Sequence, residues 1–353
     1  SMNVHRPMLT SSALKWSSLK YSRFLLGTFG TLLVLLSLGG AQATPTATKN
    51  DHAAILWRDP SDIHGRNLTY GPGGEAHMPP KTFTFEKESK AGSNPKFEVR
   101  DSNGVKWTAK MGVEAKPETA ATHLLWSLGY FTDEDYFLPE IKVDNMPAHL
   151  HRGQKYVDKD GIVKNVRLER HMADRKEIGN WKWKQNDFTG TREFNGLRVM
   201  MALMNSWDLK DENNAIYRDK DDTTLYVVSD LGATFGTTGY SWTHAMARGN
   251  LKSYRHSKFI NKVTPQYVDF NVPTRPALIY FFNVPGLFRR LGMRWIGKQI
   301  PTADVKWMAS LLSQLSSEQI LDAFRSAGYG QEEAQGFATV VEGRIADLNK
   351  RLQ

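Results

Sequence analysis

Residues 205–214 read NSWDLKDENN and follow a segment, residues 194–206, whose apolar side chains recur at the spacing of a buried helix. Within this stretch, four residues separate Asp208 from Asn213. Aspartate and asparagine near the end of a helix usually cap the helix or close a turn. Taken alone, the stretch therefore predicts a helix end and a turn, and any further role depends on the remainder of the chain.

Two other segments end in residues that suit chemistry. Residues 227–232 read VVSDLG, so Asp230 follows an apolar strand. Residues 96–110 read KFEVRDSNGVKWTAK and predict a hairpin that ends at Lys110, because two alternating runs flank an Asn-Gly pair. A single lysine at such a position usually lies in solvent, and a single Asp-Leu-Gly usually forms a turn.

The remaining pattern predicts an α+β chain, with strands dominating the first third and helices the last. Pro117 is expected to open a helix that Gly129 ends. The expected strands are residues 81–87, 140–143, 215–218 and 225–229. Hairpins are expected at residues 96–110 and 155–169. The expected helices are residues 117–129, 194–206, 302–315, 317–327 and 331–352.

The three segments together resemble motifs of the protein-kinase-like superfamily. DLKDEN at residues 208–213 differs at one position from the DLKPEN common in eukaryotic kinases, and it has the D-x-x-x-x-N spacing of the catalytic loop. DLG resembles D-F-G, WTAK resembles the V-A-I-K strand, and all three occur in the family order. The resemblance implies a bilobal fold, with a small, mostly β lobe at residues 53–150 and a larger, mostly helical lobe at residues 151–353.

The resemblance also implies roles for individual residues and for Mg-ATP as the cofactor. Lys110 would hold the α- and β-phosphates, with Glu118 as its carboxylate partner and Glu114 as the second choice. Asp208 of the catalytic loop would orient the acceptor hydroxyl and accept its proton. Asn213 of the same loop and Asp230 of the DLG would bind Mg²⁺.

Some features depart from ordinary kinases. Ser206 and Trp207 replace the His and Arg of the catalytic loop, no G-x-G-x-x-G precedes Lys110, and no A-P-E follows the DLG. The chain thus resembles atypical members: bacterial toxin-type, phosphoinositide-kinase-like and secretory-pathway kinases. The expected function is transfer of phosphate from Mg-ATP to a hydroxyl on protein, sugar or lipid. A nucleotide-binding pseudokinase with a regulatory or scaffold role is the alternative, and nucleotidyl transfer is a third.

The amino terminus predicts export. Residues 24–40 are uncharged and largely apolar, basic residues precede them, and Ala-Gln-Ala follows at residues 41–43. Residues 1–43 are therefore interpreted as a signal peptide, with a membrane anchor as the alternative, and residues 44–52 as a flexible start. The expected location is the periplasm, the exterior or a secretory lumen.

Composition narrows the classes of partner. The chain has no cysteine, which excludes disulfides, thiolate metal sites and a cysteine nucleophile. Its net charge of +9 suits an anionic substrate such as a nucleotide, and no nucleic-acid partner is expected. Residues 281–296 mix aromatic and basic residues. They are interpreted as a buried helix, with peripheral membrane contact as the alternative. Trp181 and Trp183 are expected on an exposed strand or loop.

Overall fold

The computed structural model describes residues 53–90, 94–237, 248–272 and 292–353. The signal peptide and flexible start predicted for residues 1–52 lie outside these ranges, as does most of the amphipathic segment at residues 281–296. None of the helices in the described ranges combines the length and the apolar character that a membrane span requires.

Five strands form a closed barrel in the order β2-β3-β4-β6-β5. Neighbours pair antiparallel except β2 and β5, which pair parallel and close the barrel. Alternate side chains of each strand point inward and form a core that includes Phe83, Phe97, Trp107 and Leu168. The strands are β2 (Thr82–Ser89), β3 (Lys96–Arg100), β4 (Lys106–Met111), β5 (Asp135–Asp144) and β6 (Ile162–Arg170).

The β3–β4 hairpin confirms the prediction from the Asn-Gly turn. Gly104 has φ +80°, a left-handed conformation that glycine adopts without steric cost. The buried carboxylate of Asp101 accepts hydrogen bonds from the amides of Asn103 and Val105 and from Trp107 Nε1, each at 2.9 Å. The turn thus stabilises itself and holds a core tryptophan in place.

The second predicted hairpin is only half correct. Residues 162–170 form β6, but the residues before the turn form a short 3-10 helix, η3 (Gln154–Tyr156), with a single bridge from Val157 to Val163. Because β6 pairs with both β4 and β5, the strand-rich part extends at least to Arg170. The predicted lobe boundary at residue 150 falls between β5 and β6 of this barrel, and periodicity alone does not reveal which strands pair.

A single helix connects the barrel to the helical core. Helix α1 (Ala115–Ser127) begins two residues before Pro117 and ends before Gly129, close to the prediction. It contacts β5 and β6 of the barrel and α6 of the helical part. Nearly every residue of α1 is buried, because it is covered from both sides.

A second sheet has the order β1-β9-β8-β7 and carries the segment that precedes Asp230. The hairpin predicted from residues 215–218 and 225–229 is confirmed, because β8 and β9 pair antiparallel. Asn214, the first residue of β8, lies opposite Val228, the last residue of β9. The tryptophans expected in solvent are instead buried: Trp181 and Trp183 are 2% and 3% exposed and pack against Phe194. That expectation was wrong because lysines alternate with the two tryptophans in the sequence, a pattern typical of an exposed strand or loop. The strands are β1 (Ala54–Ile55), β7 (Arg175–Gly179), β8 (Asn214–Asp219) and β9 (Thr224–Val228).

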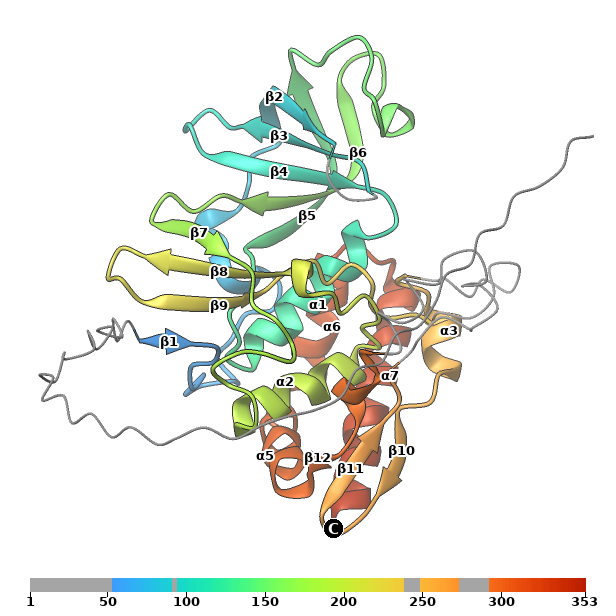
Figure 1. Ribbon diagram of the computed structural model, residues 1–353. Coiled ribbons are helices and arrows are strands. Elements are labelled where there is room, and N and C mark those ends of the chain that lie inside the picture. The colour runs from blue at the N-terminus through green and yellow to red at the C-terminus, as the bar shows by residue number, and fades with distance from the viewer. Residues whose placement is uncertain (1–52, 91–93, 238–247, 273–291) are drawn as a thin grey trace, which may run out of the picture. The chain divides into compact units, whose positions relative to one another are not determined.

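The carboxy-terminal part is mainly helical, as predicted, and occupies the orange-to-red end of the chain in Figure 1. A three-stranded sheet, β10-β11-β12, lies within it. The α+β class, with a β-rich first part and a helical last part, is thereby confirmed. The remaining elements are α2 (Arg192–Leu203), α3 (Leu251–His256), α5 (Thr302–Leu312), α6 (Ser317–Ser326), α7 (Gln331–Leu352), β10 (Ile260–Val263), β11 (Tyr267–Phe270), β12 (Ile300–Pro301), η1 (Gly71–Gly73), η2 (Glu75–His77), η4 (Asp211–Asn213) and η7 (Arg294–Gly297).

A buried arginine of α7 holds the end of α2, where the catalytic-loop motif begins. Arg344 is 6% exposed, and its Nη1 donates to the carbonyl of Leu203 at 2.8 Å and to Asn205 Oδ1 at 3.0 Å. Its Nη2 donates to Ser257 Oγ at 2.7 Å. The last carbonyls of a helix lack partners within the helix, so Arg344 acts as a cap supplied by a distant segment.

We expect Arg344→Met to lower the free energy of unfolding by about 2–4 kcal/mol, because it leaves several buried acceptors without a donor. The measurement is urea unfolding followed by circular dichroism. Arg351→Met is the matched control, since Arg351 lies on the same helix, is 52% exposed and, among the described residues, forms an ion pair only with Asp347. Equal stability of the two variants would contradict this role for Arg344.

Candidate functional site

Lys110 is the centre of a cluster of carboxylates. Its Nζ lies 2.8 Å from Glu118 Oε2, 2.8 Å from Asp230 Oδ1 and 3.0 Å from Glu114 Oε2. The lysine ends β4, whereas Asp230 follows β9, 120 residues later in the sequence. The structure thus brings Lys110 together with both predicted glutamate partners, Glu118 and Glu114, and with Asp230 of the DLG.

The burial of Lys110 explains why it needs these partners. The residue is 6% exposed, and an isolated buried ammonium is strongly disfavoured. Burial alone would lower its pKa, but the carboxylates of Glu118, Asp230 and Glu114 raise it above the ordinary value. Lys110 is therefore a fixed positive charge at neutral pH.

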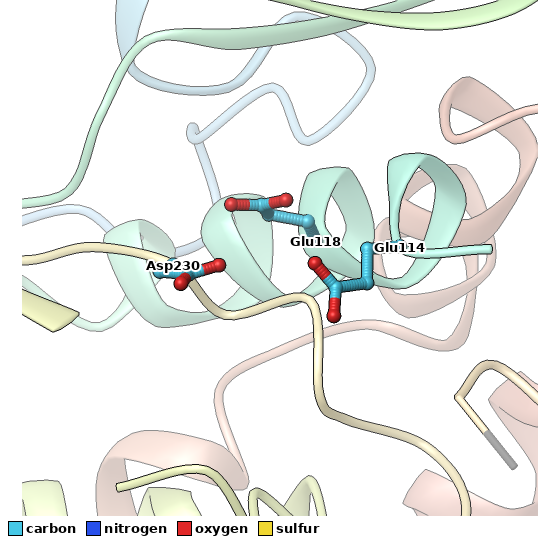
Figure 2. A group of neighbouring side chains, drawn as sticks. All are labelled: Glu114, Glu118 and Asp230. Atoms are coloured by element: carbon cyan, nitrogen blue, oxygen red, sulfur yellow. The ribbon is translucent and has the colours of Figure 1, made fainter. Parts of the chain in front are cut away.

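Two of the carboxylates come from one helical face. Glu114 is the residue immediately before α1 and Glu118 lies one turn later, so their side chains leave the helix on the same side. Figure 2 shows both glutamates facing the segment that carries Asp230. One oxygen from each of these three residues lies within 4.8 Å of the others, a set of hard oxygen ligands that suits Mg²⁺.

Arg167 supports Glu118 from the barrel, and the sequence analysis missed it. The arginine lies on β6, is 3% exposed, and places Nε 3.4 Å from Glu118 Oε2. It also pairs with Asp135 and, at 3.0 Å, with Glu169. Burial raises the pKa of Glu118 to about 7, against the opposing effect of Arg167 and Lys110. An arginine among alternating strand residues carries no signal of burial, which explains the omission.

The DLG segment has a special backbone. Asp230 adopts φ +49°, a left-handed conformation uncommon for residues other than glycine, and its side chain is 46% exposed. Burial would raise the pKa of Asp230, but the ammonium of Lys110 holds it below the ordinary value. A Cβ on Gly232 would lie 2.6 Å from Glu114 Cβ. This glycine is therefore required for the close approach of the segment to Glu114.

A second arginine, Arg248, connects this cluster to the catalytic-loop motif. Its Nε lies 2.8 Å from Glu114 Oε1, and its Cζ lies 5.0 Å from the centre of the Trp207 ring. Trp207 stands where ordinary kinases have the arginine of the catalytic loop. The Arg248 guanidinium thus packs over the Trp207 ring and also pairs with Glu114. Trp207 precedes the DLG in the sequence, whereas Arg248 follows it.

The catalytic-loop residues are held by contacts within their own loop. Asn213 Nδ2 donates to the backbone carbonyl of Asp208 at 2.6 Å, and Lys210 Nζ lies 2.9 Å from Asp208 Oδ2. Asn213 ends η4, and β8 begins at the next residue. Because Asn214 lies opposite Val228, Asn213 comes close to the end of β9 and the DLG that follows.

A polar cavity of about 240 Å³ connects these groups. Lys110, Glu118, Asn213 and Asp230 all line it. Asp208 is not among the described residues of the lining, although its loop partner Asn213 is. The described lining also includes residues that the sequence analysis did not select: Lys96, Thr108, Asp133, Arg167, Glu169, Glu177, Asn180, Glu212, Asn214, Ala215, Tyr217 and Ser229.

We expect Gly232→Ala to lower the free energy of unfolding by about 1–3 kcal/mol, because the new methyl group would overlap the Glu114 side chain. The measurement is urea unfolding. Gly343→Ala is the matched control. Gly343 lies in α7 with open space around it, so alanine there should be neutral or stabilising by up to about 1 kcal/mol. A Gly232→Ala protein as stable as the control would contradict the close packing.

Comparisons with known proteins find similarity in structure only. No family model and no curated sequence matches the chain. A Helicobacter pylori proinflammatory kinase, CtkA, is 13% identical with a TM-score of 0.42, over 78% of this chain and 98% of that one. Two structures of a Golgi casein kinase are also similar. One is 12% identical with a TM-score of 0.30, over 75% of this chain and 74% of its own. The other, with Mn and ADP bound, is 10% identical with a TM-score of 0.38, over 78% and 72%.

These proteins are kinases by name, the class that the sequence motifs resemble. Similarities of this size have no bearing on the ligands or the activity of this chain. What this chain can do chemically therefore follows from its own residues.

Proposed function

We propose that the chain is an atypical kinase-like phosphotransferase that uses Mg-ATP and transfers phosphate to a hydroxyl on protein, sugar or lipid. The observation that carries this proposal is the meeting of Lys110, Glu118 and Asp230, from three separate segments, in one cavity that Asn213 also lines. Phosphoryl transfer requires mainly positioned charges, and this set supplies both signs within one site.

The charge balance of the cluster favours a divalent cation. Arg167 and Arg248 offset part of the charge of Glu118 and Glu114, but six of the described residues that line the cavity are acidic and three are basic, so negative charge is still in excess. Asp230 and Asn213 are the proposed metal ligands, and the glutamates supply further oxygen atoms nearby. When bound, Mg²⁺ would neutralise the phosphate oxygens of the nucleotide.

Lys110 is proposed to bind the α- and β-phosphates. Its ammonium has three donors, and each now has a carboxylate nearby. Glu118, held in turn by Arg167, would keep the lysine in place when phosphate oxygens replace Asp230 and Glu114 as partners. The lysine would then act as a fixed electrostatic clamp on the donor nucleotide.

Asp208 is proposed to orient the acceptor hydroxyl and accept its proton. Asn213 holds the backbone of Asp208, which couples the position of the base to the position of the metal ligand. Lys210 Nζ lies 2.9 Å from Asp208 Oδ2 and would help to orient this carboxylate. The retention of all these groups favours an active enzyme over a pseudokinase.

The test incubates the full chain with Mg²⁺ and either γ- or α-labelled ATP. We expect γ-label transfer that falls by at least about a hundredfold in Asp230→Asn and in Asp208→Asn, because each removes a charge required in the transition state. Asp347→Asn is the control, since this aspartate lies on α7 and, in the part of the chain that the structure describes, forms an ion pair only with Arg351.

Two outcomes would overturn the proposal. Transfer of the α-label alone would indicate nucleotidyl transfer. Absence of both labels, together with a thermal shift on addition of Mg-ATP, would indicate a nucleotide-binding pseudokinase. In that case, loss of the shift in Asp230→Asn would still assign the cavity to the nucleotide.

We expect activity to decline as the pH falls below about 7, because Glu118 then takes up a proton and no longer pairs with Lys110. Asp230, whose pKa is lowered, stays ionised over the same range. The measurement is kcat/KM against pH between 5.5 and 8.5 at constant ionic strength. A profile that is flat on the acid side would contradict the assignment of the titration to Glu118.

A further inference from the structure

A second cavity, of about 180 Å³, brings together three arginines from separate segments. Arg58 follows β1, Arg66 precedes η1, and Arg175 begins β7. The rings of Trp126 and Phe131 also line this cavity, which we call the arginine cavity. In the described part of the chain, it shares no lining residue with the cavity around Lys110.

The positive charge of the arginine cavity is not balanced by the protein. Of the described residues that line it, only Glu134 is acidic. The Glu134 carboxylate already has partners, because it lies 2.9 Å from His77 Nδ1 and 3.6 Å from an Arg170 nitrogen. Within the described residues, Arg58 and Arg175 make no ion pair, so the cavity carries an excess of cationic donors.

The contacts of Arg58 and Arg66 orient the guanidinium groups without neutralising them. Arg66 Nη1 donates to the Trp126 carbonyl at 2.8 Å, and Arg66 Cζ lies 4.7 Å from the Trp126 ring centre. Arg58 Cζ lies 5.5 Å from the ring centre of Phe131. Burial lowers the pKa of Arg66, with Asp62 opposing, so a bound anion would relieve an electrostatic cost.

The backbone around the cavity is fixed by its own hydrogen bonds. The amide of Arg58 donates to the Gly129 carbonyl at 2.9 Å, and Trp57 Nε1 donates to the Leu128 carbonyl at 2.6 Å. Gly129 has φ +95°, and a Cβ there would lie 2.2 Å from the Arg58 carbonyl oxygen. The segment that carries Arg58 is therefore locked onto the end of α1, which reduces the entropic cost of binding a ligand.

We propose that the arginine cavity is a binding site for a phosphate group, either free phosphate or a small phosphomonoester. The planar guanidinium fork matches phosphate oxygens, and several such groups converge here. At about 180 Å³ the arginine cavity is smaller than the cavity of about 240 Å³ around Lys110, which favours a compact anion at this site. The inference does not depend on the proposed kinase activity.

The position of the arginine cavity relates it to the first cavity. Thr132 and Glu134 line the arginine cavity, whereas Asp133, between them in sequence, lines the cavity around Lys110. Successive residues of this segment thus face different cavities. A phosphate bound by the arginines would lie across one chain segment from the proposed phosphotransfer site.

The test titrates the full chain with inorganic phosphate and, separately, with phenyl phosphate, at constant ionic strength by calorimetry. We expect binding that weakens by about tenfold or more in Arg175→Gln and further in Arg58→Gln/Arg175→Gln, because each loses charge-assisted hydrogen bonds. Arg192→Gln is the control, since Arg192 also lies over an aromatic ring, with Cζ 4.7 Å from the Trp307 ring centre, away from this cavity.

A further variant, Lys110→Met, separates the two cavities, because Lys110 is the other candidate phosphate ligand. Retained binding in Lys110→Met with loss in the Arg175→Gln variants supports the proposal. Tighter binding of phenyl phosphate identifies a phosphomonoester as the ligand, and equal or weaker binding identifies free phosphate. Binding that is lost in Lys110→Met but unchanged in Arg58→Gln/Arg175→Gln overturns it, as does the absence of binding to the wild-type chain. Melting temperatures without phosphate confirm that the variants are folded.

Discussion

The ammonium of Lys110 is the charge on which the described site depends. A buried lysine requires nearby carboxylates, and this one has three, from α1, from the residue before it and from the DLG segment. Each carboxylate is in turn held from elsewhere: Glu118 by Arg167 of the barrel, and Glu114 by Arg248. Ion pairs between basic and acidic side chains thus link the barrel, α1 and the segment after β9.

The departures from ordinary kinase motifs have structural counterparts in this network. Trp207 stands in place of an arginine, and Arg248 packs over its ring while pairing with Glu114. A cation therefore remains beside the catalytic loop, but it comes from a different segment. At the start of the same loop, Arg344 of α7 binds the last carbonyls of α2. These arginines explain how a loop without the usual His-Arg pair is held in place.

The two cavities differ in the sign of their excess charge. Around Lys110, negative charge is in excess, which suits a divalent metal and a nucleotide. Around Arg58, Arg66 and Arg175, positive charge is in excess, which suits a compact anion. Asp133 and its neighbours separate the two environments by a single chain segment, so opposite electrostatic fields exist side by side within one fold.

Local patterns were enough to predict most of the helices and strands and the motif residues, because helix and strand periods, the Asn-Gly turn and the order of Lys110, the catalytic loop and the DLG are all visible along the sequence. The family resemblance pointed to Glu118, with Glu114 as the second choice, as the partner of Lys110, and both pair with it in the structure, as does Asp230. The fold was needed to show that β6 belongs to the barrel, that Trp181 and Trp183 are buried, and that three arginines share a cavity. Those facts depend on pairing and packing between distant segments, which no local pattern encodes.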